Sequence, residues 1–397
     1  MCYSNMKLLM IVGFANDIFV YNMAKWLKAK IDKITIDIIE YNDSSKGTQD
    51  YGFEYYDSVT TMPQSFFLHY IPFVRNYTID WDKCRQLKKM LKGKHFDIIQ
   101  CHYVLGLYAN ATYLKEHCNR LYFSFWGGDK YSKYLGSTKL FREKIKNILL
   151  NYSDGLINGD YSTARNWAIN DRIPTFYRGN FGSAPLENLF YLLEKESHSM
   201  SKEFWHIPPN KLSVQLGYSG KEIHQYIEIV EELKKYDEYK NSIHLLVPMT
   251  RDRNNEYVDK VEIALKNSGY TYTLIKDRFL SDMEVAKLRN SVDVFLQLAS
   301  RDGYSRSVIE VLFAGALVIY GEWLGYEQKF KRDGFYGISV SSIENACSGL
   351  GKIIDNFDNY SEMLKLNKEK ANSKYLWSEC INDWVAVYQG IAEPTTK

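Results

Sequence analysis

The sequence lacks the usual signatures of secreted, membrane-spanning and metal-binding proteins. Its six cysteines are scattered without a C-x-x-C pair, and no histidine spacing resembles a zinc site, so we expect a reducing, cytoplasmic compartment. The early apolar run from Leu8 to Val12 is interrupted by Gly13, Asn16 and Asp17, too soon for a signal peptide or a bilayer span. Low-complexity tracts and short repeats are also missing, which predicts that the chain folds throughout.

The net charge of +2 is small but unevenly distributed. Residues 1–180 carry +7, from 24 Lys and Arg against 17 Asp and Glu, and residues 181–397 carry −5, from 26 against 31. A positive lobe attracts anionic partners such as a membrane surface, a lipid pyrophosphate or nucleic acid. Of these we expect a lipid-linked partner, with peripheral binding at the inner face of the cell membrane, and no nucleic acid. The alternative is that the two groups of basic residues form solvent-exposed helix faces and bind no partner. The basic residues are Arg85, Lys88, Lys89, Lys92, Lys94, Lys139, Arg142, Lys144 and Lys146.

An apolar stretch lies just before the first of these basic clusters. Together they would let the chain insert shallowly while the cations meet lipid headgroups. The alternative is that the aromatic side chains belong to the core. The stretch comprises Phe66, Phe67, Tyr70, Ile71, Phe73 and Val74.

Strand-like and helix-like segments alternate twice along the chain. Short apolar runs recur between stretches of helical spacing, which predicts parallel sheets covered on both faces. At 397 residues two domains are expected. The predicted fold class is therefore α/β, with two Rossmann-like doubly wound domains facing a cleft. The expected boundaries are 1–196 for the first domain, 197–210 for a linker containing Pro208 and Pro209, 211–374 for the second domain, and 375–391 for a helix crossing back to the first.

The most informative stretch is D-V-F-L-Q-L-A-S-R-D-G-Y-S-R-S-V-I-E-V-L-F-A-G-A-L-V-I-Y, from Asp293 to Tyr320. It predicts a strand, a polar loop, a helix that ends at Gly315, and another strand. Unpaired N–H groups at the helix start, aided by the helix dipole, would suit a diphosphate. The candidate groups belong to Ser305, Arg306 and Ser307.

Two acidic residues, Asp302 and Glu310, are separated by seven positions around this loop. The pattern resembles the donor-site signature of the large retaining GT-B glycosyltransferase family, although that family usually has Glu at the first position. The resemblance implies that Asp302 lies beside the donor sugar and that Glu310 accepts hydrogen bonds from ribose hydroxyls. As ordinary structural residues, Asp302 would be a turn residue and Glu310 would pair with Arg306 on an exposed helix face.

Three further loops match this family by position. L-G-Y-S-G-K and V-P-M-T-R, at 216–221 and 247–251, follow the first two strands of the second domain, and the loop 277–280 follows the third. The first two also resemble loops of the 4-acetamido-4,6-dideoxygalactosyltransferases. The implied donor-binding residues are Lys221 and Arg251, with Arg253 in reserve, for the pyrophosphate, and Arg278 and Phe279 for the base.

The first domain also offers candidate residues. The turn G-F-A-N-D resembles the acceptor-side loop of the family, with Gly13 and Asn16 as its candidates. Two strand ends, Q-C-H-Y and S-F-W-G-G-D, resemble the His-containing strand and the G-x-D turn of the family. Their catalytic candidates are His102 and Asp129. The alternatives are a structural histidine and a helix cap.

The resemblance implies a metal-independent hexosyltransferase that moves a sugar from a nucleotide sugar to a polysaccharide or lipid-linked acceptor, as in capsule or O-antigen synthesis, without a cofactor. The large family points to retention of configuration and the dideoxysugar relatives to inversion, so both stay open. The D-x-D at Asp80–Asp82 would bind a metal-held diphosphate or cap a helix. The remaining alternatives are a nucleotide-sugar 2-epimerase of GT-B shape and a non-catalytic GT-B-like sugar-binding subunit.

Overall fold

The computed structural model divides the chain into two compact units. Unit 1 comprises Met1–Gly182 and Trp377–Lys397, and unit 2 comprises Ser183–Leu376. The residues described are 5–42, 52–63, 75–102, 111–124, 146–147, 149–158, 164–165, 168, 170–182, 184–193, 195–250, 254–276 and 278–395.

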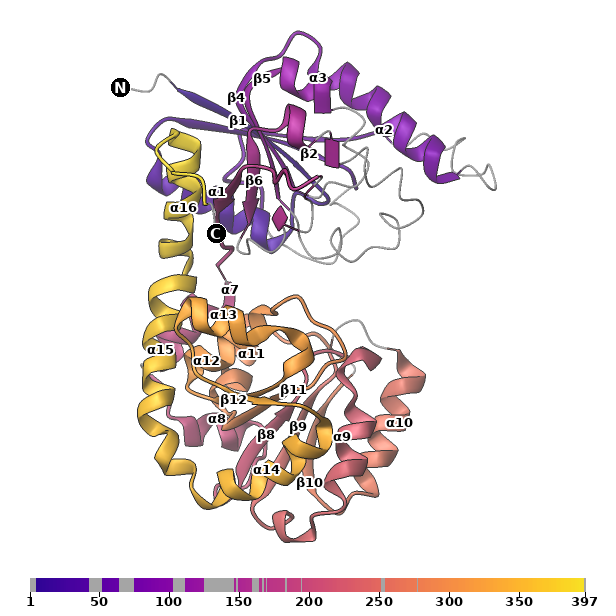
Figure 1. Ribbon diagram of the computed structural model, residues 1–397, viewed down its shortest axis with the longest axis vertical. Helices are drawn as coiled ribbons and strands as arrows, with labels where there is room; N and C mark the ends of the chain where they lie inside the picture. Colours follow the sequence, from indigo (N-terminus) through magenta and orange to yellow (C-terminus); the bar gives the residue numbers. More distant parts are fainter. Residues whose placement is uncertain are drawn as a thin grey trace. The chain divides into compact units, whose positions relative to one another are not determined.

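Unit 1 is built on a parallel sheet. Its strands are β1 (Met6–Val12), β2 (Ile34–Glu40), β3 (Ser58–Thr61), β4 (Phe96–His102), β5 (Cys118–Ser124), β6 (Gly155–Asn158) and β7 (Phe176–Arg178). They lie in the order β3-β2-β1-β4-β5-β6-β7 (Figure 1). Parallel neighbours need long crossover connections, and helices supply several of them. The helices described in this unit are α1 (Ile18–Lys30), α2 (Arg75–Leu91), α3 (Ala111–Glu116) and α16 (Trp377–Gln389).

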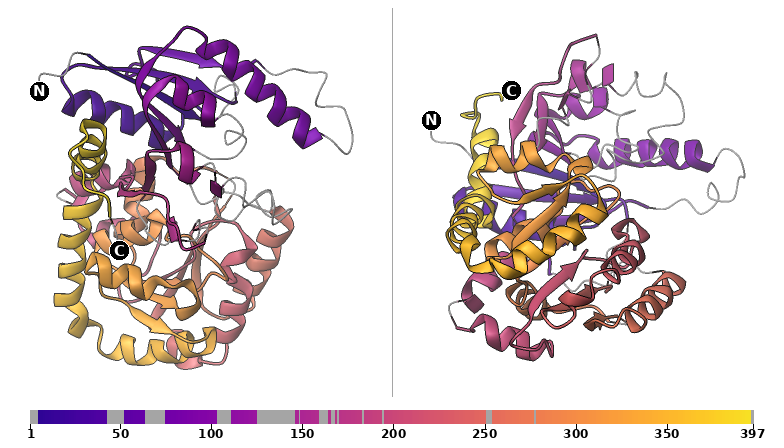
Figure 2. Two further views of the ribbon diagram at one scale, coloured as in Figure 1. Left: turned by 45° about the horizontal axis from the view of Figure 1, so that its top comes forward. Right: turned by 60° about the horizontal axis from the view of Figure 1, so that its bottom comes forward.

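Different helices cover the two faces of this sheet because side chains alternate along each strand. In β1, Leu8 and Met10 pack with α1 and α16, whereas Leu9 packs with α2 and α3. The yellow α16 lies beside the indigo α1 in both views of Figure 2. Trp377 and Trp384 of α16 are fully buried, so the end of the chain completes the core of unit 1.

Unit 2 is a second parallel sheet, with strands in the order β10-β9-β8-β11-β12-β13. Its strands are β8 (Leu212–Leu216), β9 (Ile243–Pro248), β10 (Thr271–Ile275), β11 (Val294–Gln297), β12 (Leu317–Gly321) and β13 (Ile338–Val340). Its α-helices are α7 (Ala184–Leu193), α8 (His198–Phe204), α9 (Tyr226–Leu233), α10 (Asn255–Lys266), α11 (Asp282–Asn290), α12 (Arg306–Ala314), α13 (Tyr326–Asp333), α14 (Ile343–Asp355) and α15 (Ser361–Tyr375).

Both faces of the second sheet are also buried. Val214 and Leu216 of β8 pack with α9, α10 and α14, whereas Phe295 of β11 and Val318 of β12 pack with α7, α11, α12, α13 and α15. Strands buried on both faces need nearly continuous apolar sequences, and that is why they were visible in the sequence. The predicted α/β class with two doubly wound domains is confirmed.

The segment expected to be a linker, residues 197–210, is instead packed within unit 2. The Ser197 side chain caps α8 by accepting a hydrogen bond from the Met200 N–H. Lys202 Nζ lies 2.6 Å from Asp293 Oδ2, and both side chains are 9% exposed. The boundary therefore falls between Gly182 and Ser183, because α8 is tied to the start of β11 by a buried ion pair.

Two helices differ from their expected limits. The D-x-D at Asp80–Asp82 was expected at most to cap a helix, but α2 begins at Arg75, so both residues lie within the helix and not at its start. The helix expected at 375–391 is divided at Leu376, whose backbone is extended between α15 and α16. Within the described parts of the chain, no helix is both long and apolar enough to cross a bilayer.

Candidate functional site

The middle of the sheet in unit 2 is a topological switch point. β8 and β11 are neighbours, but the chain continues from β8 toward β9 on one side and from β11 toward β12 on the other. Loops that leave the carboxyl ends of two such strands diverge, and ligands of open α/β sheets bind in the crevice between them. Here these loops are residues 217–221 and 298–305.

Asp302 holds three chain segments together at this point. Its Oδ2 accepts hydrogen bonds from the backbone N–H groups of Tyr304, at 2.9 Å, and Ser305, at 2.8 Å, and from the Tyr326 hydroxyl. Its Oδ1 accepts one from the Tyr218 hydroxyl, at 2.6 Å. Tyr218 follows β8 and Tyr326 opens α13, so the carboxylate is fixed by residues from both sides of the switch point.

Tyr304 has a strained backbone. Its φ of 76° lies in the left-handed region, which is uncommon for a bulky side chain and costs on the order of 1–3 kcal/mol. The strain is held by the Asp302 hydrogen bond and by ring contacts with Tyr326 and Phe330. Burial also raises the pKa of Tyr304, so its hydroxyl stays protonated. Backbone strain of this kind is concentrated at functional sites.

The first turn of α12 is already partly hydrogen-bonded. The Ser305 N–H donates to Asp302, and the Ser307 N–H donates to the Ser305 side chain at 3.1 Å. The expectation of three unpaired N–H groups is therefore wrong for Ser305 and Ser307, because a polar cap occupies both. Arg306 remains as the candidate N–H donor to a diphosphate.

Glu310 lies beneath this turn in a buried network. Arg289 Nε lies 3.0 Å from Glu310 Oε2, and the same guanidinium donates to Gln215 at 3.3 Å and to the Ser307 hydroxyl at 2.9 Å. The exposed ion pair with Arg306 is therefore not formed. The Arg306 guanidinium instead lies over the Tyr375 ring, 5.2 Å from its centroid.

A buried histidine lies in the 3-10 turn η5 (Glu222–His224), directly after the loop that follows β8. His224 Nε2 lies 2.9 Å from the Ser219 hydroxyl oxygen, and its ring packs edge-on against Tyr218. Burial lowers the pKa of His224 to about 4, although the Asp302 carboxylate opposes the shift. The imidazole is therefore neutral near pH 7. Lys221, three residues earlier, is exposed at the same edge of the sheet.

No protein-family model matches this chain, and no curated protein matches it in sequence. Solved structures do match almost its full length. Sucrose-phosphate synthase from Thermosynechococcus elongatus has a TM-score of 0.71 at 12% identity, with 97% of this chain and 99% of that chain covered. HepE from Anabaena, in complex with UDP and glucose, has a TM-score of 0.67 at 12% identity, with 97% and 100% covered.

A putative UDP-N-acetylglucosamine 2-epimerase from Listeria monocytogenes has a TM-score of 0.64 at 13% identity, with 98% of this chain and 96% of that chain covered. This chain has the GT-B fold. Identities this low leave the activity of the chain to be argued from its site.

Two donor-side candidates of this GT-B chain lie on the loop after β10. Arg278 forms an exposed ion pair with Glu284, with Nη1 and Oε1 2.5 Å apart, and Phe279 is 69% exposed. Ser281 and Glu284 form a capping box at the start of α11, which fixes where this loop ends. Arg251 and Arg253 of the neighbouring loop lie outside the described residues.

The acceptor-side loop after β1 is anchored by Glu40, whose Oε2 accepts a hydrogen bond from the Ala15 N–H at 2.8 Å. The Gly13 carbonyl accepts one from the Asn42 side chain at 3.2 Å. Asn16 is 6% exposed, so it lies in the packed part of this turn. Hydrogen bonds to Glu40 and Asn42 therefore fix this loop, and its role in binding the acceptor stays a prediction.

His102, at the end of β4, is completely buried near the rings of Phe181 and Trp384. Burial lowers its pKa to about 3. A base that weak is poorly matched to deprotonating an acceptor near pH 7, so this environment opposes the catalytic role. Asp129 lies outside the described residues.

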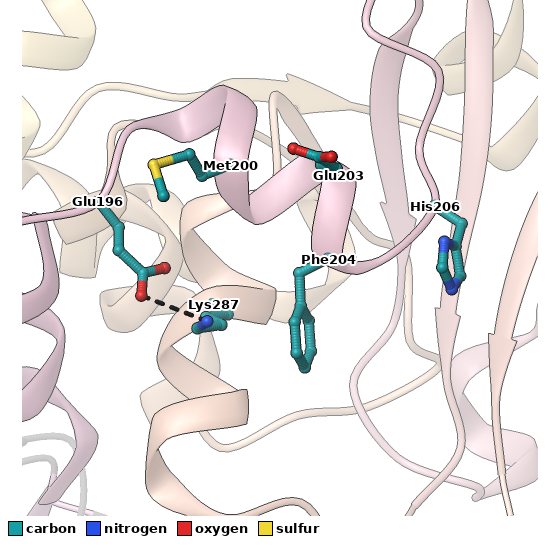
Figure 3. A pocket seen from close by; sticks show the side chains of 6 residues that line it. All are labelled: Glu196, Met200, Glu203, Phe204, His206 and Lys287. Atoms are coloured by element: carbon teal, nitrogen blue, oxygen red, sulfur yellow. Dashed lines mark ion pairs between the residues drawn. The ribbon is translucent and has the colours of Figure 1, made fainter.

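A separate open pocket of about 490 Å³ lies between α8 and α11 (Figure 3). Lys287 lies across it from Glu196, with 3.2 Å between Nζ and Oε1, and 4.6 Å above the centre of the Phe204 ring. Because α8 is joined to Asp293 at the start of β11, this pocket and the Asp302 loop lie toward opposite ends of that strand. It therefore takes no part in the candidate site.

Sequence reasoning missed the residues that organise the site. Tyr218 and Tyr326 fix Asp302, and Arg289 fixes Glu310, across sequence separations of 84, 24 and 21 residues. The tyrosines had no detectable signal in a chain that contains 32 of them. Arg289 did carry one, because an arginine in the last helical turn before a buried strand needs a partner.

Proposed function

We propose that this chain is a cytoplasmic glycosyltransferase that moves a sugar from a nucleoside-diphosphate sugar to a glycan or lipid-linked acceptor in cell-surface glycan synthesis. One observation carries the proposal: a strained polar loop, fixed through Asp302, opens a helix at the switch point of the second sheet. Helix N-termini at such points bind phosphate groups. HepE, a similar structure, is described in complex with UDP and UDP-glucose, which supports a nucleotide-sugar donor.

In the proposed site, three loops each bind a different part of the donor. Lys221, Arg251 and the Arg306 N–H would stabilise the negative charge that grows on the diphosphate as the glycosidic bond breaks. Asp302 would hold the loop beside the sugar, and Glu310 would meet the ribose. Cationic side chains and a helix N-terminus together offset the diphosphate charge, so we propose that turnover is independent of metal ions and cofactors.

We further propose that the reaction retains the configuration of the sugar. An inverting enzyme needs a base for the acceptor hydroxyl. His102 is buried and its pKa is lowered to about 3, so it is poorly suited to that role. In a retaining reaction the departing phosphate takes the acceptor proton on the same face, and no protein base is required. Proton NMR of the new linkage would show whether the product retains the anomeric configuration of the donor sugar.

The acceptor is proposed to lie at an anionic membrane surface. Lys88 and Lys89 of α2 and Lys92 and Lys94 just after it are exposed, in a half of the chain that carries +7. Such cations each contribute about 1 kcal/mol near an anionic surface. The aromatic stretch at residues 66–74 lies outside the described residues, and of the second basic cluster only Lys146 is described.

Donor binding and turnover test the function. A panel of nucleotide sugars, beginning with UDP-glucose, is screened by thermal shift, and the best binder is then incubated with and without a lipid-linked acceptor. We expect transfer only when acceptor is present, unchanged by EDTA. Release of an epimerised sugar without acceptor would instead identify a 2-epimerase activity, the alternative that the similar Listeria structure suggests. Binding without turnover would identify a sugar-binding subunit, and EDTA sensitivity restored by Mn²⁺ would contradict the metal-independent mechanism.

A further inference from the structure

Trp323 occupies the short 3-10 turn η7 (Glu322–Leu324) between β12 and α13. β12 is the parallel neighbour of β11, with Gln297 opposite Tyr320. The turn and the Asp302 loop therefore leave adjacent strands at the same edge of the sheet. The indole is 42% exposed, although tryptophan is usually well buried.

The indole is fixed on two sides. Its Nε1–H donates to the backbone carbonyl of Ala299 at 2.7 Å, three residues before Asp302. A Cβ atom placed on Gly321 would lie 2.3 Å from the six-membered ring. The ring therefore packs directly on the backbone of Gly321, where any larger residue would collide with it. A ring held in this way presents a rigid aromatic surface and loses little conformational entropy when a ligand covers it.

The Asp302 loop beside Trp323 is the part of the site nearest the proposed sugar. Phe279, the exposed aromatic residue of the base-side loop, follows β10, four strand positions from β12. At about 4.8 Å per strand, the two strand ends are roughly 19 Å apart. A nucleoside-diphosphate sugar is an extended molecule. If its base packs against Phe279, its sugar therefore lies on the side of the sheet where Trp323 is.

We propose that Trp323 is a specificity-determining residue whose indole face packs against the pyranose ring of the donor. This inference rests on the proposed function. The C–H groups of a pyranose form an apolar, weakly positive face, which complements the negative face of an aromatic ring. The contact would select for the sugar and contribute nothing to the nucleoside diphosphate.

Calorimetry with UDP-glucose and UDP, or with the best nucleotide sugar of the panel and its nucleoside diphosphate, tests this assignment. We expect Trp323→Ala to weaken nucleotide-sugar binding about tenfold and to leave nucleoside-diphosphate binding unchanged. Trp323→Phe should restore most of the loss, which also guards against a folding defect. Phe279→Ala should weaken both ligands equally. Tyr336→Ala, at a side chain that is 51% exposed elsewhere in unit 2, is the matched control and should change neither.

Tryptophan fluorescence supplies a second measurement. We expect a blue shift with the nucleotide sugar, absent with the nucleoside diphosphate and absent in Trp323→Phe, because the sugar covers the indole. If Trp323→Ala weakens both ligands equally, or neither, the assignment of the sugar to Trp323 is wrong while the proposed function stands. If the wild-type protein binds no nucleotide sugar, the function and the inference fall together.

Discussion

Arg289 and Glu310 form an ion pair inside unit 2, with 3.0 Å between Nε and Oε2 and only 7% of each side chain exposed. Removing one partner of a buried pair leaves the other charge without compensation, which costs about 3–5 kcal/mol. The pair also ties the second acidic residue of the donor motif to the first turn of α12 through Ser307. A change at Glu310 therefore affects both stability and the site.

We predict that Glu310→Gln lowers the free energy of unfolding of unit 2 by about 3 kcal/mol and weakens donor binding by about 1–3 kcal/mol. Urea unfolding and calorimetry measure the two effects. Glu256→Gln is the control, since Glu256 forms an exposed helical pair with Lys260 and such pairs contribute little to stability. Equal losses in the two variants would contradict the buried-pair argument.

Asp302→Asn removes the charge but keeps the shape of the side chain. We expect stability to fall by about 2 kcal/mol, because the bonds from the Tyr304 and Ser305 N–H groups become neutral, and donor affinity to fall about tenfold as the loop loosens. Tyr218→Phe removes one hydroxyl and should cost about 1 kcal/mol. Donor affinity equal to wild type in Asp302→Asn would exclude this loop from the donor site.

His102→Phe should make unit 1 less sensitive to acid. The pKa of His102 is lowered to about 3 in the folded protein, below the value of about 6.5 expected in the unfolded chain. The unfolded state therefore binds a proton first as the pH falls, and stability is lost from about pH 6.5 downward. Between pH 7 and pH 5 this histidine accounts for about 2 kcal/mol, by which the pH dependence of unfolding should shrink in the variant. An unchanged dependence would show that His102 is accessible to protons in the folded state.

Lys202→Met should destabilise unit 2 by about 3 kcal/mol, because the buried Asp293 carboxylate loses its nearest cation. Thermal unfolding compares it with Lys235→Met, which removes an exposed partner of Glu232 and should change stability much less. If residues 197–210 acted as a flexible linker after all, the two variants would behave alike.

Reversing the charge of Lys88, Lys89, Lys92 and Lys94 to Glu should release the protein from vesicles that contain anionic lipid. The wild-type interaction should weaken with added salt, since exposed charges are screened within a Debye length of about 10 Å at 0.1 M. Co-sedimentation measures binding, and donor affinity should stay unchanged. A wild-type protein that ignores anionic vesicles at low salt would favour a soluble glycan acceptor.

The features that were predicted from the sequence are local, whereas those that were missed depend on contacts between distant segments. The apolar spacing of the sequence predicts a strand at Leu212–Leu216, and β8 has these limits, because a strand buried on both faces is a short, mostly apolar run. The edge strands β3, β7 and β13 were missed, since three or four half-exposed residues carry no clear pattern. In the site, a helix start near Ser305 was predicted, and Ser305 is the N-cap of α12. The partners of Asp302 and Glu310 were not predicted, because they come from other segments that only the folded sheet brings near.

The chain enters and leaves unit 2 once each, at Ser183 and at Leu376, and then returns to unit 1 as α16. On the ribosome, the whole of unit 2 therefore emerges before the helix that carries Trp377 and Trp384. Unit 2 has every residue of its core at a time when unit 1 still lacks two of its largest buried side chains. Domains usually mature from the N-terminus as they are synthesised. In this protein the half that is translated first must wait for the last helix, so its apolar surface needs protection during the interval.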